Sequence, residues 1–390
     1  MITTTADLAE ACSRLSRHAY VAVDTEFLRE TTYWPKLCVA QLAGPDTAVI
    51  VDALAPGLDM APFLELMRDE RVVKVFHAGR QDIEIIFRLG DFVPHPVFDT
   101  QVAAMVCGYG ESISYDQLVQ KISGDHIDKS SRFTDWTRRP LTEKQLAYAL
   151  SDVTHLRDVY HNLAARIAEQ GRADWVNDEM RVLTSRSTYD QRPEDAWERL
   201  KMRIRKPVDL VILKELAAWR EREARARDVP RSRVMKDEAI YEIVGEQPSD
   251  VAALGQLRSL SRGFERSRQG EEIIACVKRA LATPKDQLPV VPKPKVTPEG
   301  AFAAIDLLKV LLKLVAERHG VAAKVIATVD ELEAIAIDDD ADVPALTGWR
   351  RELFGVAALE LKHGRLALTF DGKRVVTRAT SEAERLPAAR

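Results

Sequence analysis

The stretch Ala19–Glu26 (AYVAVDTE) decides the fold, because its side chains alternate in hydropathy, as in a β-strand, and it ends in an acidic patch. Alternation with a period of two residues predicts a half-buried β-strand. Three further short runs rich in β-branched residues follow, at Lys36–Leu42, Ala48–Val51 and Val72–Phe76. No helix-length gap separates the first three strands, so we expect an antiparallel meander. Helices are then expected to pack on a mixed sheet.

Helical periodicity takes over after these strands. Apolar residues recur at helical spacing in Gln81–Leu89, which stops at Gly90, and in a long segment over 142–170. Thr142 is the expected N-cap of the long helix, and Gln145 three residues later completes a capping box. Residues 1–170 are therefore expected to form one α/β domain. Shorter helices within it are predicted at Ala61–Asp69, Asp99–Val106 and Ser114–Ile122.

Beyond residue 170 the pattern changes character. A polar, charged connecting segment is expected at 171–207, followed by helical patterns at 208–287 and 300–378. Between these two, residues 288–299 are rich in proline and predict a semi-rigid linker of polyproline type. Residues 379–390 are expected to be a frayed tail.

The two helical stretches share spacings that are typical of a repeat. A glycine-aromatic pair precedes a second glycine by the same distance in both, at Gly263 and Gly270 and again at Gly348 and Gly355. Chance recurrence of short patterns is the alternative. The second stretch ends in LALTF-DG-KRVV, which predicts a hairpin with a type I′ turn at Asp371-Gly372.

Composition excludes several classes of protein. The 390-residue chain is 46% hydrophobic and 30% charged, as globular proteins are, and unlike disordered or collagen-like chains. No apolar run of about 18 residues is present, so neither a transmembrane helix nor a membrane partner is expected. The start of the chain does not resemble a signal peptide. The four cysteines are scattered, which disfavours a disulfide-linked partner and a zinc site and favours a cytoplasmic location.

Charge is unevenly distributed along the chain. Residues 1–170 contain 17 Lys and Arg against 24 Asp and Glu, whereas residues 201–295 contain 21 against 14. An acidic first part can hold divalent cations, and a basic later part can hold a phosphate backbone. Chance drift of surface charge is the alternative.

Four carboxylates and a tyrosine are the candidate catalytic residues. Asp24 and Glu26 lie two apart on the first strand and so face the same side, although such a pair is more often a solvated strand face. Asp82 follows another strand at the start of a helix, where it can equally complement the helix dipole. Tyr148 and Asp152 lie four apart on the long helix and share one face. An exposed aspartate beside a half-buried tyrosine is the alternative there.

Taken together, these residues have a chemistry in common. Carboxylate oxygens suit hard cations such as Mg²⁺ or Mn²⁺. Two such ions can activate a water and stabilise the leaving oxygen of a phosphodiester, and a tyrosine hydroxyl can orient that water. The set therefore predicts two-metal phosphodiester hydrolysis, with the choice between the two metals left open.

The segments that carry these residues resemble a known family. VAVDTEF, FHAGRQDIEII and YALSDV are similar to the three exonuclease motifs of the DEDD superfamily, and the Tyr-x-x-x-Asp form of the third marks its DEDDy branch. DKSSRFTDWTRRPLTEKQLAYALSDV, with FDTQ before it, resembles the ribonuclease D family. Residues 208–287 are similar to an HRDC domain, and 300–378 to a second, more divergent one. The resemblance implies a ribonuclease H-like mixed sheet with flanking helices, plus two all-α helical HRDC-like domains.

The resemblance also implies a role for each motif residue. Asp24, Glu26 and Asp152 would bind one metal ion, with Asp24 bridging to a second, and Asp82 would act near that second ion. Tyr148 would orient the attacking water. The family trims RNA from the 3′ end, tRNA precursors included, and releases 5′-mononucleotides. RNA is thus the expected partner, the alternatives being a DNA 3′–5′ exonuclease and a non-catalytic RNA-binding scaffold; the oligomeric state is open.

Other residues have two interpretations each. His77 either touches the scissile phosphate or is a buried, satisfied histidine. Lys129, Arg132 and Trp136 either hold RNA through its backbone and a stacked base or belong to a solvated loop. Asp99 either supports the site or caps a helix. Arginines of the first helical stretch either face phosphates or pair with neighbouring glutamates, and they are Arg220, Arg222, Arg225, Arg227, Arg231 and Arg233.

Overall fold

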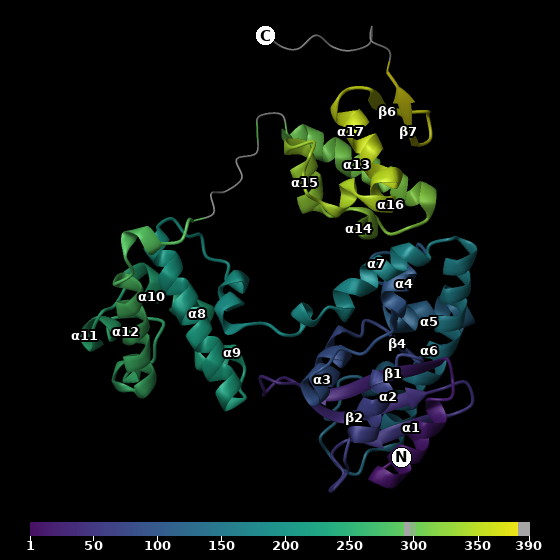
Figure 1. Ribbon diagram of the computed structural model, residues 1–390, viewed down its shortest axis with the longest axis horizontal. Helices are drawn as coiled ribbons and strands as arrows, with labels where there is room; N and C mark the ends of the chain where they lie inside the picture. The colour runs from purple at the N-terminus through teal and green to yellow at the C-terminus, as the bar shows by residue number, and fades with distance from the viewer. Residues whose placement is uncertain (292–297, 299–300, 381–390) are drawn as a thin grey trace.

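The computed structural model describes residues 1–291, 298 and 301–380. Figure 1 shows an α/β domain, a helical block beside it and a second helical block stacked on it. We call these blocks the first helical block (residues 207–287) and the second helical block (residues 301–379). Within the described ranges, no helix combines the length and the apolar character needed to cross a bilayer.

The α/β domain is built on a five-stranded mixed sheet in the order β3-β2-β1-β4-β5. The first three strands form the expected antiparallel meander, and β4 and β5 extend it parallel to β1. The predicted fold class is therefore confirmed. The sequence did not reveal β5, because three residues are too few for a period to be visible. The strands are β1 (Tyr20–Leu28), β2 (Lys36–Ala43), β3 (Ala48–Asp52), β4 (Val73–Phe76) and β5 (Val97–Asp99).

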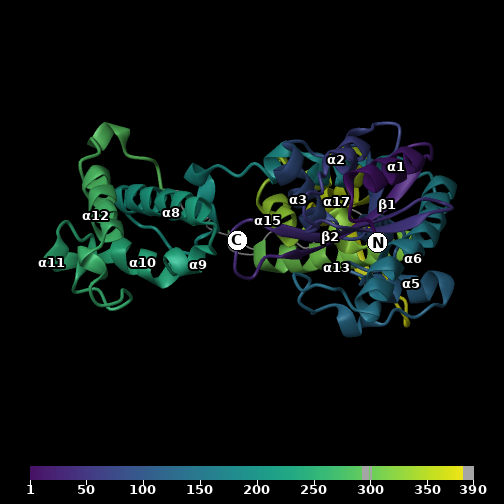
Figure 2. The same cartoon turned by 90° about the horizontal axis from the view of Figure 1, so that it is seen from below.

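Helices cover both faces of this sheet, with α1 and α2 on one side and α5 and α6 on the other (Figure 2). Val21 and Val23 of β1 face the core shared with α1, α2 and α3. Ala22 faces the opposite way, toward Val153 and Leu156 of α6. Alternate side chains of β1 thus pack into two apolar layers, one on each face of the sheet. The helices are α1 (Thr5–Leu15), α2 (Ala61–Arg68), α3 (Arg80–Gly90), α4 (Thr100–Val106), α5 (Tyr115–Ser123) and α6 (Glu143–Glu169).

The long helix α6 begins where the sequence predicts. The Thr142 hydroxyl accepts a hydrogen bond from the Gln145 N–H at 3.2 Å, and Gln145 Oε1 accepts one from the Thr142 N–H at 3.0 Å. This capping box fixes the first turn of the helix. The candidate residues Tyr148 and Asp152 follow within the next three turns, so the cap also fixes their direction.

The segment 171–207 is more ordered than a simple connection. It contains α7 (Ala173–Thr184), whose Val176 and Met180 are buried in a core shared with α4. Two 3₁₀ turns follow, at Arg186–Thr188 and Pro193–Arg199. Only two residues of α7 are buried, so its apolar stripe is too narrow to stand out from a charged sequence. The domain boundaries predicted from the sequence remain our proposal.

Both helical blocks contain, in this order, a long helix, a helix of four residues, a third helix and a last long helical segment, and the first block has a further four-residue helix, α11, before its last helix. Val234 and Ile326 end the two four-residue helices, in agreement with a repeat. The last helix of the second block passes through a π-helical turn at Arg351–Gly355. The helices are α8 (Pro207–Arg227), α9 (Arg231–Val234), α10 (Asp237–Glu246), α11 (Val251–Leu254), α12 (Arg268–Leu281), α13 (Ala301–His319), α14 (Ala323–Ile326), α15 (Val329–Ile337), α16 (Gly348–Arg350) and α17 (Val356–Lys362).

The predicted C-terminal hairpin is present as β6 (Leu366–Phe370) and β7 (Val375–Ala379). Its turn differs from the prediction. Asp371 N–H donates to the Arg374 carbonyl at 3.1 Å, so Gly372 and Lys373 are the central residues. Gly372 has a φ of +95° and Lys373 does not have a positive φ, whereas a type I′ turn needs two. Most of the proline-rich segment, and residues 381–390 of the tail, lie outside the described residues.

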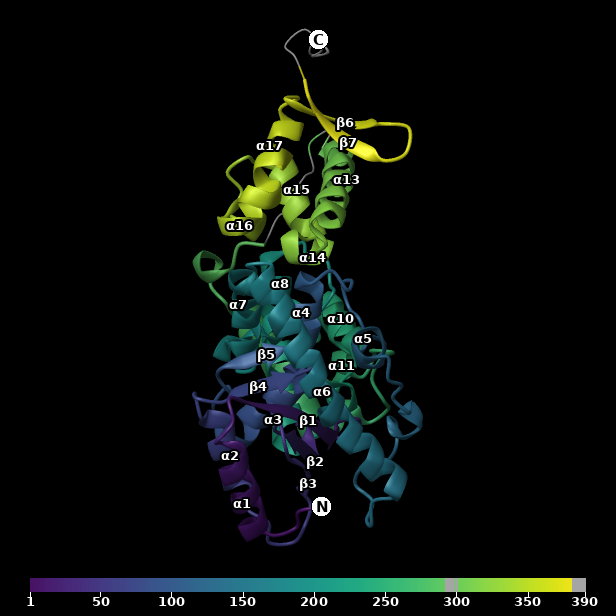
Figure 3. The same cartoon turned by 90° about the vertical axis from the view of Figure 1, so that its right-hand side faces the viewer.

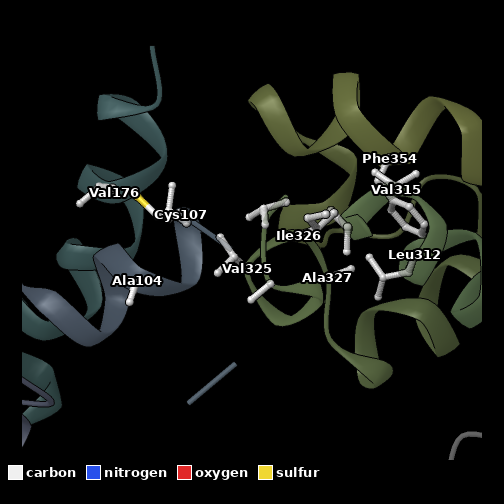
Figure 4. Packing of buried hydrophobic residues seen from close by; sticks show 14 of the residues in the cluster. Ala104, Cys107, Val176, Leu312, Val315, Val325, Ile326, Ala327 and Phe354 are labelled. Atoms are coloured by element: carbon white, nitrogen blue, oxygen red, sulfur yellow. The ribbon is translucent and has the colours of Figure 1, made fainter. Parts of the chain in front are cut away.

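The second helical block shares a hydrophobic core with the α/β domain. Figure 3 shows α14 against α4 and α7. Figure 4 shows Val325 of α14 on the side of Cys107, with Ile326 further into the second block toward Val315, and all four belong to the same buried cluster. The Ala322 N–H donates to the Met105 carbonyl at 2.9 Å across this contact. Burial of apolar surface therefore holds this block in place.

The first helical block is attached differently, through polar contacts and through the rings of Tyr33 and Trp34, which pack against its apolar core. The loop between β1 and β2 reaches α8, where the Asp228 carboxylate accepts hydrogen bonds from the Tyr33 and Trp34 N–H groups at 3.1 and 3.0 Å. The Tyr33 hydroxyl donates to the buried Glu221 carboxylate. This block consequently meets the α/β domain along a charged seam.

Candidate active site

Three carboxylates converge at the end of the central strand. Asp24 and Glu26 lie on the same face of β1, and Asp152 approaches them from α6. One oxygen of each lies within 4.8 Å of the others. Carboxylates at such distances repel one another unless a cation lies between them. The arrangement is therefore one that could hold a divalent cation.

Asp82 approaches the same point from α3. It is 7% exposed, and its carboxylate accepts a hydrogen bond from the hydroxyl of Thr25, the residue between the two strand carboxylates. The helix that carries it starts directly after β4. Each of the four predicted acidic residues is thus brought to the end of β1.

Burial and mutual repulsion make these carboxyl groups unusually hard to ionise. Burial, followed by the charge of Asp152, raises the pKa of Asp24 well above its usual range and that of Glu26 to about 9. Burial raises the pKa of Asp82 to about 6 and that of Asp152 to about 7, although hydrogen bonds from Thr25 and Tyr148 oppose the two shifts. Shifts of this size are typical of functional sites.

Tyr148 lies one turn before Asp152 on α6. Burial and the Asp152 charge raise the pKa of its hydroxyl, which therefore stays protonated at neutral pH. Its ring centroid lies 6.3 Å from that of Trp136. The hydroxyl is thus a neutral hydrogen-bonding group at the edge of the carboxylate cluster.

Asp99 fixes the turn that delivers Asp82. Its carboxylate accepts hydrogen bonds from the Ala78 and Gly79 N–H groups, at 3.1 and 2.8 Å, and from the Gln101 N–H at 2.8 Å. It therefore caps α4 and supports the site as well, so both interpretations hold. The turn itself contains Ala78 and Gly79. The positive φ belongs to Ala78, whereas a side chain at Gly79 would meet the Phe76 Cβ at 2.4 Å.

The carboxylates open into a cleft of about 780 Å³. His77 lines it, with Nδ1 at 3.0 Å from the Thr100 hydroxyl and a buried Nε2 that has no hydrogen-bond partner in the described residues. This histidine is accordingly only half satisfied. Lys129 forms a 2.6 Å ion pair with Asp116, and the charge of Arg132 lowers the pKa values of the nearby Glu26 and Asp152 carboxyls.

Two aromatic residues of this cleft differ in exposure. Trp136 is 5% exposed and packs with Tyr148, whereas Phe133 is 91% exposed. The sequence analysis passed over Phe133, because a single aromatic in a polar loop has no periodic signal. Gln41 was also missed: it pairs with Asp24 across the β1–β2 ladder, is fully buried, and its amide has no partner in the described residues.

Most arginines of the first helical block are paired. Arg220 is buried and contacts Asp237 at 2.6 Å. Arg222 and Arg227 pair with Glu194 and Glu223 at 3.0 and 3.7 Å. The interpretation as pairs with neighbouring glutamates therefore holds for Arg227, whereas the partners of Arg220 and Arg222 are an aspartate and a glutamate from other segments. Arg225 and Arg231 instead surround Glu221 at the seam with the α/β domain.

Comparisons with known proteins support the architecture throughout. A family model described as 3′–5′ exonuclease matches residues 1–168, and an HRDC domain model matches residues 209–277. The chain is 60% identical to Ribonuclease D of Nitrobacter hamburgensis, over 96% of this chain and 98% of that protein. It is 48% identical to Ribonuclease D of Gluconacetobacter diazotrophicus, over 96% and 95%.

A solved structure agrees with these sequence relatives. Escherichia coli RNase D has a TM-score of 0.82 and 31% identity to this chain, over 93% of this chain and 98% of that one. Similarity at this level spans the α/β domain and both helical blocks. The chain belongs to the ribonuclease D family of metal-dependent 3′–5′ exoribonucleases.

Proposed function

We propose that this protein shortens RNA stepwise from its 3′ end by two-metal hydrolysis, releases 5′-mononucleotides, and acts on structured RNAs such as tRNA precursors. The observation that carries the proposal is the convergence of Asp24, Glu26 and Asp152 within 4.8 Å at the end of the central strand. Three carboxylates rarely gather at a half-buried point without a cation to neutralise them.

The donor set fits Mg²⁺ or Mn²⁺. All the converging groups are carboxylates, which hard cations prefer, and neither a cysteine nor a histidine lies among them. Gln41 supports the same fit, because its buried, unpartnered amide faces the layer that contains Asp24. A buried polar group of this kind commonly has a water or ion as its partner.

Each acidic residue receives a role in this proposal. Asp24, Glu26 and Asp152 would hold one ion, with Asp24 shared by a second ion near Asp82. Two bound metal ions would supply an activated water and stabilise the leaving oxygen of the phosphodiester. Tyr148 would orient that water through its neutral hydroxyl, which Asp152 holds in place.

The walls of the cleft provide contacts for the RNA itself. Lys129 and Arg132 would attract the phosphates next to the scissile one. The exposed ring of Phe133 offers a face on which a base can stack. Trp136 would support the loop that carries this ring, and His77 would line the cleft beside the phosphate. These contacts involve backbone and base faces, so they favour a broad set of sequences.

We infer the substrate class from a related protein of known structure and from the state of the cysteines. The E. coli protein is described as an exoribonuclease involved in structured RNA processing, and we extend that class to this chain. All four cysteines are buried free thiols, which fits the reducing cytoplasm where such RNAs are processed.

The test uses the purified full-length chain with a 3′-extended tRNA precursor and a DNA strand of matched sequence, in Mg²⁺, Mn²⁺ or EDTA. We expect stepwise shortening of the RNA, release of nucleoside 5′-monophosphates, and no shortening in EDTA. Equal shortening of the DNA would favour the DNA exonuclease. No shortening of either polymer with any divalent metal would favour the RNA-binding scaffold.

A further inference from the structure

A second hollow lies next to the catalytic cleft, between the α/β domain and the first helical block. Its volume is about 330 Å³. Its walls are the loop after β1, one face of α3, the segment around 188–199, and the end of α8 with α9. We call it the arginine groove, because six arginines line it: Arg29, Arg80, Arg88, Arg199, Arg225 and Arg231.

The carboxylates around this groove neutralise only part of its charge. Glu84, the one carboxylate in the described lining, accepts two hydrogen bonds from Arg29, at 2.7 and 3.3 Å. Glu221 lies underneath and is shared by three guanidinium groups at 3.8, 3.3 and 2.5 Å, those of Arg199, Arg225 and Arg231. Asp190 and Asp228 flank the groove, but Asp190 pairs with Arg186 and Asp228 accepts backbone N–H groups.

Two arginines of the groove have no carboxylate within ion-pair distance in the described part of the chain. They are Arg80 and Arg88, which lie with Glu84 on one stripe of α3 because they are spaced four residues apart. The Arg88 guanidinium lies 3.3 Å from the ring centroid of Trp34. Burial lowers the pKa of Arg88, and the positive charge of Arg225 lowers it further. An anion in the groove would relieve this repulsion.

The groove adjoins the catalytic cleft. Arg29 and Gln81 line both hollows. Gln81 directly precedes Asp82, so the groove starts at the first turn of the helix that carries this catalytic candidate. A strand whose 3′ end lies among the carboxylates can therefore continue into the groove without leaving the surface.

We propose that the arginine groove binds the phosphodiester backbone of the RNA strand behind the nucleotide being removed. Guanidinium groups match phosphate oxygens in geometry as well as charge, and they read no base. The groove would hold the substrate between successive cleavages without selecting its sequence. This inference rests on the proposed RNA exonuclease function, to which it adds a substrate-holding site outside the cleft.

The test compares Arg80→Gln/Arg88→Gln with a control, Arg14→Gln/Arg17→Gln. Each double variant removes two exposed arginines that form no ion pair in the described structure. Arg14 and Arg17 lie at and just after the end of α1, before the first residue of β1, whereas the carboxylates lie toward the other end of that strand. Binding of a fluorescent RNA decamer is measured in EDTA over a salt series. Cleavage of a dinucleotide, too short to fill both hollows, is measured with Mg²⁺.

We expect the groove variant to bind the decamer about tenfold more weakly and to cleave the dinucleotide like wild type. Its plot of log affinity against log salt should be shallower by about 1.4, since each phosphate contact on a single strand contributes about 0.7. The control should match wild type in both assays. A decamer affinity and salt slope equal to those of the control would overturn the groove. An equal fold-loss in decamer affinity and in dinucleotide cleavage would overturn it as well.

Failure of the groove and failure of the proposed function give different results in this experiment. Wild-type protein that binds the decamer but shortens no RNA would refute the exonuclease function, while the salt slopes would still decide the groove. Thermal unfolding of both double variants controls for folding, because Arg88→Gln also removes the contact of the guanidinium with the Trp34 ring.

Discussion

The catalytic cleft and the arginine groove are neighbouring hollows of opposite charge. The cleft takes its four candidate metal-binding carboxylates from β1, α3 and α6, all within one domain. The groove takes its six arginines from the α/β domain, the connecting segment and the first helical block. Cations complete the first hollow and an anionic strand suits the second. The difference separates the chemical step from the holding of the substrate.

That separation has a structural basis in how the helical blocks are attached. The second block is held by a shared apolar core that includes Ile326 and Val176, and it contributes no residue to either hollow. The first block meets the α/β domain through Tyr33, Glu221 and their arginines. A charged seam leaves polar groups available to a ligand, whereas an apolar core leaves none.

The largest effect is expected in the cleft. Asp152→Asn keeps the shape of the side chain but removes a ligand charge. Loss of several kcal/mol of metal-dependent stabilisation corresponds to a rate reduced about 10³-fold or more. Single-turnover cleavage at saturating RNA measures this, and RNA affinity in EDTA should stay within about twofold. Asp158→Asn, exposed on the same helix, is the control; a normal rate in Asp152→Asn would contradict the metal assignment.

A smaller effect on the same step is expected from Tyr148→Phe. Losing a hydroxyl that orients the attacking water should lower the single-turnover rate about 10²-fold, the scale of such proton and water positioning. RNA affinity should not change, because the ring and its contact with Trp136 remain. Tyr160→Phe, on the same helix but packed against Phe98, is the control. Equal rates for Tyr148→Phe and wild type would remove this hydroxyl from the mechanism.

The pH dependence of the cleft should have a defined sign. Its carboxyl pKa values in the folded, metal-free protein are raised, to about 6 for Asp82, 7 for Asp152 and 9 for Glu26. The folded protein therefore binds protons at these carboxyl groups more tightly than the unfolded chain does. Its free energy of unfolding falls as pH rises from about 4 toward about 9, because the buried groups must then ionise. Divalent cations reverse this loss by pairing with the ionised groups.

Thermal unfolding with and without Mg²⁺ checks that sign. The increase in Tm caused by Mg²⁺ should be larger at pH 8 than at pH 6, by about 2–4 °C for each kcal/mol gained. Asp24→Asn should reduce the increase at both values. A larger increase at pH 6 would contradict the account of the buried carboxylates.

The smallest effect on either hollow is expected from Ile326→Ala. This side chain is fully buried in the core between the second block and the α/β domain, so its truncation should cost about 2–5 kcal/mol of stability. RNA affinity and single-turnover rate below the melting transition should be unchanged. Leu307→Ala, half-exposed on α13, is the control for unfolding. A loss of RNA affinity in folded Ile326→Ala would mean that the second block shapes a hollow.

The sequence predicts the cleft far better than the groove. Asp24, Glu26, Tyr148 and Asp152 lie on two elements whose periods are strong, and the Thr142 cap fixes one of them. Local rules therefore place these residues on the correct faces. β5 and α7 escaped prediction because one is three residues long and the other buries only two residues.

The groove depends on contacts that no local rule encodes. Arg88 and Arg225 are 137 positions apart, and each follows a helical pattern typical of a solvated surface. Only the docking of Tyr33 and Trp34 against α8 brings them together. Phe133 was missed for a related reason, because exposure of a single ring in a loop depends on tertiary structure.

The most direct test of this division applies both assays to one variant of the cleft and one variant of the groove. Decamer affinity in EDTA and single-turnover cleavage at saturating RNA are measured for Asp152→Asn and for Arg80→Gln/Arg88→Gln. We predict that Asp152→Asn binds like wild type without cleaving, and that the arginine variant binds weakly yet cleaves at the wild-type rate once saturated. Weak binding by Asp152→Asn, or slow cleavage by the saturated arginine variant, would contradict the division.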